Sequence, residues 1–150
     1  MEESEFERET RFVSAISGAG PQAGPRQVLR SWVDKRTGAA RHQLYVTDTH
    51  REPWYFWVRA NDDRANPLEF VSIARDVGEC SAYGGCMLTE VFGATLPAAT
   101  LARGRTSGVC VKFYARSGSD YIVCLTPEEI TAHLDAIAAR RSIGRRDAAR

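Results

Sequence analysis

Four cysteines are the residues whose type and spacing could do the most chemistry in this chain of 150 residues. Cys80 and Cys86 bracket five residues that end in Gly84-Gly85, which predicts a tight loop between two strands with the glycines at positive φ. Cross-strand neighbours at the mouth of such a loop can reach the Cα separation of about 5.5–6 Å that a disulfide requires. The spacing therefore favours a Cys80–Cys86 disulfide, which by loop closure adds roughly 2 kcal/mol.

Other states of the cysteines stay open. All four could be reduced and buried, since free cysteine is among the most buried residue types. Gaps of five, twenty-three and thirteen residues disfavour a metal site, because zinc ligands usually come in closely spaced pairs. A second disulfide between Cys110 and Cys124 needs a register change, because a two-residue Ser117-Gly118 turn places Cys124 opposite Val111.

A carboxylate pair is the second candidate for chemistry. If the first two cysteines face each other, the hairpin places Asp76 opposite Glu90. Like charges directly across a strand pair destabilise it unless a cation bridges them, one takes up a proton, or an arginine intervenes. The pair is thus a candidate cation site or acid/base dyad, and the alternative is neutralisation by an arginine or a bulge that shifts the register. The arginines in question are Arg30, Arg59 and Arg75.

An aromatic run supplies candidate ligand-binding residues. Strand alternation puts Tyr55 and Trp57 on one face and Trp54 and Phe56 on the other. One face should join the core, whereas the other could stack on a sugar or peptide, because amphipathic rings are favoured at interfaces. Burial of both faces is the alternative. The candidate contact residues are Trp54, Tyr55, Trp57 and Tyr83.

Histidines and nucleotide motifs indicate no further site. His42 and His50 bound one predicted strand about 27 Å long, too far apart to share a metal ion. His133 flanks the apolar stripe of the last predicted helix. No nucleophile elbow, zinc-protease motif or phosphate-binding glycine loop is present. The sequence therefore predicts no cofactor and no metal, and it favours a non-enzymatic domain.

The elements that must position these residues are mainly strands. Short β-branched and aromatic runs, separated by Gly, Asn, Asp and Pro, predict six to seven strands of a mainly antiparallel sheet. A short helix near 97–103, ended by Gly104, and a C-terminal helix near 127–141, opened by the capping box Thr126-Pro-Glu-Glu129, complete an α+β fold. The predicted strands lie in 28–34, 43–49, 54–58, 68–77, 87–96, 109–115 and 121–125.

The chain divides into three predicted segments. Residues 1–25 are an acidic arm followed by a Gly/Ala/Pro linker, expected to be flexible, 26–141 form one β-rich domain, and 142–150 form a basic tail. Twenty Lys and Arg nearly cancel nineteen Asp and Glu, so no global field attracts nucleic acid or anionic lipid. Five arginines in residues 140–150 could still bind phosphates, which keeps nucleic-acid association as an alternative.

Localisation depends on the N-terminus. No stretch approaches the roughly 20 apolar residues of a membrane helix. The acidic start is unlike a signal peptide, so the chain as written is expected in the cytoplasm. If a leader was removed, it is expected in the periplasm or outside the cell.

Several stretches over about residues 26–140 are similar to a group of small bacterial exported or lipoprotein-like proteins with no assigned activity. These stretches are His42–Val46, Trp54–Trp57, Ile73–Val77, Cys80-x₃-Gly84-Gly-Cys86-x₃-Glu90-x-Phe92-Gly and Leu125-x-Pro127 to Leu134. The resemblance implies an envelope or secreted setting and one intact disulfide, and it supplies no catalytic residue. The signal peptide or lipid-attached cysteine of that group is absent here.

The function expected from the sequence is a non-enzymatic binding or structural domain of the bacterial cell envelope, with a protein or glycan partner. Two alternatives come from other classes. One is an intracellular nucleic-acid-associated protein that uses the Arg140–Arg150 tail, although the balanced charge argues against nucleic acid as a partner. The other is a small cation-dependent enzyme that uses Asp76 and Glu90. Nothing in the sequence indicates an oligomeric state.

Overall fold

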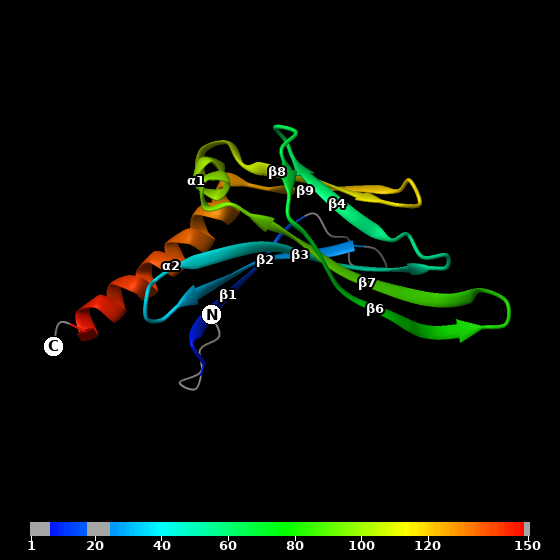
Figure 1. The fold of residues 1–150 in the computed structure, drawn as a ribbon, viewed down its shortest axis with the longest axis horizontal. Helices are drawn as coiled ribbons and strands as arrows, with labels where there is room; N and C mark the ends of the chain where they lie inside the picture. Colours follow the sequence, from blue (N-terminus) through cyan, green and yellow to red (C-terminus); the bar gives the residue numbers. More distant parts are fainter. Residues whose placement is uncertain (1–6, 18–24, 149–150) are drawn as a thin grey trace.

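A computed structural model describes residues 7–17 and 25–148 of the chain, which form nine strands and two helices. The strands are β1 (Glu9–Ala15), β2 (Pro25–Asp34), β3 (Ala40–Arg51), β4 (Trp57–Asp62), β5 (Pro67–Leu68), β6 (Phe70–Ser81), β7 (Gly85–Leu96), β8 (Val109–Ala115) and β9 (Asp120–Leu125), and the helices are α1 (Ala98–Ser107) and α2 (Pro127–Ala148). One sheet has the order β1-β2-β3-β7-β6 and the other β5-β4-β8-β9, with antiparallel pairing throughout (Figure 1). The predicted α+β class with mainly antiparallel strands is confirmed.

The main core joins both sheets to the two helices. Leu44 of β3 and Phe92 of β7 belong to the same buried cluster as Phe113 of β8, Leu101 of α1 and Ile130 of α2. The rings of Phe92 and Phe113 meet edge to face with centroids 5.0 Å apart, a geometry that adds about 0.5–1.5 kcal/mol to area burial. Strand alternation therefore places one face of each sheet against the other elements, as the sequence pattern predicts.

The two helices follow their predicted starts but extend past their predicted ends. The capping box at α2 is confirmed, since the Thr126 N–H donates to Glu129 Oε1 and the Glu129 N–H donates to Thr126 Oγ1. Gly104 does not end α1 but lies inside the helix. A Cβ at this position would lie 2.5 Å from the Ile130 side chain. The helix α2 continues through Gly144 to Ala148, so most of the predicted basic tail is helical.

The N-terminal arm also differs from its prediction. Residues 9–15 form β1, which pairs with β2 along its whole length. Phe12 explains the docking, because it is only 3% exposed and packs in a second core cluster with Val33 and Ile137. Residues 1–6 and 18–24 of the predicted arm and linker lie outside the described residues.

Two disulfides cross-link the hairpins. The Cys80–Cys86 bridge joins β6 to β7, as predicted. A second bridge joins Cys110 of β8 to Cys124 of β9, and no cysteine is free. The reduced and metal-bound alternatives are therefore contradicted.

The second disulfide forms because the β8–β9 turn is one residue longer than the sequence suggested. The Ala115 N–H donates to the Ser119 carbonyl, which leaves a three-residue turn over 116–118 with Gly118 at a φ of 97°. One additional turn residue shifts the register by one position, so Cys110 faces Cys124 directly.

Loss of each disulfide is expected to destabilise the protein according to the loop it closes. The Cys110→Ser/Cys124→Ser variant should lose about 3 kcal/mol of unfolding free energy, and Cys80→Ser/Cys86→Ser about 2 kcal/mol, because longer loops restrict the unfolded chain more. Urea unfolding of the two variants measures both values. A larger loss for the shorter loop would contradict the loop-closure explanation.

Candidate functional site

A buried cluster of three ionisable side chains lies where β3 pairs with β7. Asp48 and Glu90 are directly opposite each other, and His50 is two residues farther along the same face of β3. Their exposed fractions are 2%, 2% and 9% respectively. The potential ligand atoms of all three lie within 4.8 Å of one another. The antiparallel register thus concentrates two carboxylates and an imidazole in one protected place.

The carboxylate partner of Glu90 differs from the predicted one. On β6, Arg75 pairs with Glu90 and Asp76 pairs with Thr89, because a bulge near the hairpin tip shifts the register. The expected Asp76–Glu90 pair is therefore not formed. The guanidinium Nε of Arg75 instead lies 3.9 Å from Glu90 Oε1, and the opposing carboxylate comes from Asp48 on β3.

Glu90 fixes the segment that crosses from β3 to β4. Its Oε2 accepts a hydrogen bond from the Tyr55 N–H at 3.0 Å, and its Oε1 accepts one from the Phe56 N–H at 2.9 Å. The indole N–H of Trp57 donates to Asp48 Oδ2 at 3.0 Å. Three consecutive residues are thus held by the two buried carboxylates, which explains why no regular strand forms over 54–56.

His50 makes a hydrogen bond through each of its ring nitrogens. Its Nδ1 lies 2.8 Å from the Arg51 carbonyl oxygen, which can only accept, so Nδ1 carries a hydrogen. Its Nε2 lies 2.8 Å from Glu90 Oε2. The Tyr55 ring stacks on the imidazole with centroids 3.8 Å apart. Desolvation raises the pKa of the neighbouring Asp48, against the opposing effects of the Trp57 hydrogen bond and the nearby His50.

A pocket of about 530 Å³ reaches this cluster from the surface. Asp48 and His50 line it, together with the rings of Tyr55, Trp57 and Tyr121. Two of the predicted contact residues, Tyr55 and Trp57, are therefore found here. Trp57 is mainly a core residue, however, because it is 4% exposed and its ring stacks on Phe92.

The other two predicted contact residues lie elsewhere. Tyr83 is fully exposed at the tip of the β6–β7 hairpin, which extends away from the helices in Figure 1. Trp54 is half-buried, with its ring centroid 6.4 Å from that of Phe56. Neither residue lines the pocket beside Asp48. The structure therefore does not bring the four predicted contact residues together.

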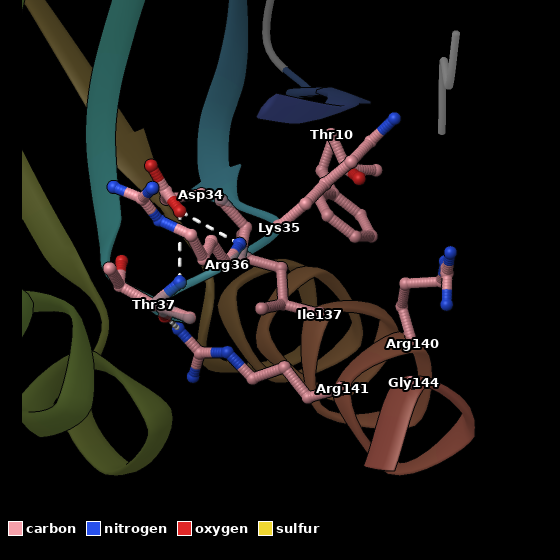
Figure 2. A pocket seen from close by; sticks show the side chains of 12 residues that line it. Thr10, Asp34, Lys35, Arg36, Thr37, Ile137, Arg140, Arg141 and Gly144 are labelled. Carbon is pink, nitrogen blue, oxygen red and sulfur yellow. Dashed lines mark hydrogen bonds between the residues drawn. The ribbon is translucent and has the colours of Figure 1, made fainter. Parts of the chain in front are cut away.

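A second pocket, of about 490 Å³, lies between the β2–β3 turn and α2, and we call it the basic pocket (Figure 2). Its lining combines four cationic side chains with an apolar floor. The cationic residues are Lys35, Arg36, Arg140 and Arg141, and the apolar residues are Phe12, Val33 and Ile137. The sequence indicated the two helical arginines, but it gave no sign that the β2–β3 turn would bring two more cations beside them.

Asp34 is the one carboxylate among the described residues that line the basic pocket. Its Oδ1 accepts the backbone N–H groups of Arg36 and Thr37 at 2.8 and 2.9 Å, and these hydrogen bonds lower the pKa of Asp34. Arg141 donates to the Gly38 carbonyl, which ties α2 to the same turn. These contacts hold the rim of the pocket in place.

Two buried histidines join α2 to the larger sheet. Ser31 Oγ lies 2.6 Å from His42 Nδ1 and 2.8 Å from His133 Nε2, and Ser14 Oγ lies 2.7 Å from His133 Nδ1. Desolvation lowers the pKa of His133 to about 4, with the neighbouring His42 as a smaller cause, and desolvation also lowers the pKa of His42. Since Ser31 is 0% and His133 1% exposed, this network has a structural role.

No protein-family model, curated protein or solved structure matches this chain. Its fold and cross-links define a disulfide-linked α+β domain with two antiparallel sheets. Within the described residues, the basic pocket and the Asp48–His50–Glu90 cluster are two places where functional groups lie next to a cavity.

Proposed function

We propose that this protein is a non-enzymatic binding domain that holds an acidic glycan of the cell surface in the basic pocket. The observation that carries the proposal is that four cationic side chains line one cavity of about 490 Å³. That volume lies within the usual range of small-ligand sites, about 300–1,000 Å³. A glycan unit with a carboxylate, sulfate or phosphate group matches the volume of this cavity and complements its cationic side chains.

The residues of the pocket suit both parts of such a ligand. Arginine guanidinium groups bind carboxylate and phosphate oxygens through two parallel hydrogen bonds, and Arg36 of the β2–β3 turn and Arg140 of α2 both line the pocket. Phe12 and Ile137 offer apolar surface to the C–H face of a sugar ring. No histidine or thiol is among the described lining residues, and the single carboxylate is engaged in a turn, which favours binding over catalysis.

The covalent structure supports an oxidising setting. Two disulfides fit an extracellular or periplasmic protein. Within the described residues, neither helix has the length and apolar character needed to cross a membrane. In the proposed setting, the bacterial cell envelope, acidic glycans are abundant and nucleic acid is scarce. That is why we favour a glycan over the nucleic-acid partner that the arginine tail also suggests.

Reversing two charges in the basic pocket is expected to weaken glycan binding. The Arg36→Glu/Arg140→Glu variant should bind a heparin hexasaccharide at least about tenfold more weakly at low salt, because two attractive contacts become repulsive. Titration calorimetry measures the affinity. Arg26→Glu is the matched control, since Arg26 is exposed at the far end of β2, about 27 Å from Asp34 along the strand.

Two results of that experiment would contradict the proposal. Equal weakening in the Arg26→Glu control would mean that heparin responds to net charge and not to the pocket. Tighter binding of a short DNA duplex than of the hexasaccharide, lost in the double variant, would assign the pocket to nucleic acid.

A further inference from the structure

We propose that Asp48, His50 and Glu90 bind one divalent transition-metal ion, at a site separate from the basic pocket. The ligands are a carboxylate oxygen of Asp48, Nε2 of His50 and Oε2 of Glu90. One imidazole with two carboxylates is a donor set that suits zinc, manganese or iron(II) better than magnesium, which prefers oxygen ligands alone.

The spacing of two ligand atoms fits a shared ion. His50 Nε2 and Glu90 Oε2 are 2.8 Å apart. An ion about 2.1 Å from each atom would see them separated by about 85°, close to the angle between neighbouring positions of an octahedron. Asp48, directly across the strand pair from Glu90, then closes the site from β3.

The groups around the cluster hold each ligand as the outer partners of metal sites do. The Nδ1–H of His50 donates to the Arg51 carbonyl, which fixes the tautomer that leaves Nε2 as the ligand atom. Trp57 donates to Asp48 Oδ2, and the backbone N–H of Tyr55 donates to Glu90 Oε2. These contacts orient the three ligands whether or not an ion is bound. Their partners, Arg51, Trp57 and Tyr55, are not members of the cluster.

The charge of the cluster also favours a dication. Asp48 and Glu90 are cross-strand neighbours that are both 2% exposed, an arrangement that is costly for two carboxylates. The guanidinium of Arg75 comes no nearer than 3.9 Å to Glu90. A divalent ion between the carboxylates balances both charges at once.

The adjoining pocket gives the ion a route and free positions. Asp48 and His50 line that cavity of about 530 Å³, so an ion can enter from solvent. Three protein ligands leave coordination positions for water, as in metal sites that remain open to exogenous ligands.

Calorimetric titration of the full chain with Zn²⁺ and Mn²⁺ tests the site. The expected result is one ion per chain, bound by Asp48, His50 and Glu90. Asp48→Asn should weaken binding by about tenfold or more while keeping an acceptor for Trp57, and the affinity of Asp120→Asn should be unchanged. Asp120 lines the same pocket but is exposed and paired with Lys112.

Three outcomes would overturn the proposal. These are no heat at millimolar Zn²⁺ or Mn²⁺, affinity unchanged in Asp48→Asn, and Mg²⁺ bound as tightly as Zn²⁺. The stoichiometry of metal binding is measured on the unaltered protein, so a folding defect in the variant does not prevent a decision. A metal-dependent rise in the unfolding temperature that is present in the unaltered protein and lost in Asp48→Asn is a second expected readout.

Discussion

Replacing Glu90 with alanine is expected to lower the free energy of unfolding by about 3–5 kcal/mol, measured with a chelator present. The carboxylate is 2% exposed and accepts hydrogen bonds from His50, Tyr55 and Phe56. Alanine would leave two backbone N–H groups without acceptors and His50 Nε2 without its hydrogen-bond partner. Each buried donor left unpaired costs about 1–3 kcal/mol.

Urea unfolding of the Glu90→Ala variant measures this loss. Glu79→Ala is the matched control, because Glu79 is exposed on the same hairpin and should change stability by no more than about 0.5 kcal/mol. A loss below about 1 kcal/mol for Glu90→Ala would show that water replaces the carboxylate and that the β3–β4 crossing does not depend on it.

Acidification is expected to destabilise the protein through His133. Its folded pKa of about 4 lies below the ordinary value of 6.5. Between these values the unfolded chain binds a proton that the folded protein does not, so stability is complete above pH 6.5 and falls as the pH drops toward 4. The loss over that window is about 3 kcal/mol from His133 alone, and His42, whose pKa is also lowered, adds to it.

Chemical unfolding at a series of pH values tests this expectation. A His133→Gln variant should be less stable at pH 7 but should show a shallower fall between pH 6.5 and 4. The same slope in the variant and the unaltered protein would mean that other groups cause the acid response. The comparison of slopes separates the lost titration from the lost packing.

Local signals in the sequence were sufficient for some elements. The capping box at Thr126 and Glu129 lies within one helical turn, and the loop between Cys80 and Cys86 lies within one hairpin. Each depends on residues close in sequence, so each could be predicted correctly. The α+β class follows from the same kind of local periodicity.

Features that depend on distant pairing could not be read in this way. The sequence pattern identified Glu90 as one member of a carboxylate pair, but its partner Asp48 lies on a strand 42 residues earlier and not on the adjacent hairpin strand. No local pattern tells which of the two neighbouring strands supplies the opposing carboxylate. The β8–β9 register lies within one hairpin, yet its prediction was also wrong. One additional turn residue makes Cys110, and not Val111, the partner of Cys124.

The formation of the basic pocket depends on where α2 ends. Its four cations come from the β2–β3 turn and from the end of α2 that continues beyond residue 141. A helix that stopped at a predicted boundary would leave Arg140 and Arg141 at a frayed end. The docking of β1 through Phe12 supplies the floor, and that strand lies in a segment whose composition indicated flexibility.

The two disulfides have a mechanical consequence. Each closes a loop within one hairpin, so neither covalently joins the two ends of the chain. A pulling force applied at the termini therefore acts first on β1 and α2, which are held by Phe12, Ile137 and the Ser14–His133 hydrogen bond. Both elements line the basic pocket. A ligand bound there would contact both the first strand and the last helix, and it would therefore raise the force at which the domain unfolds.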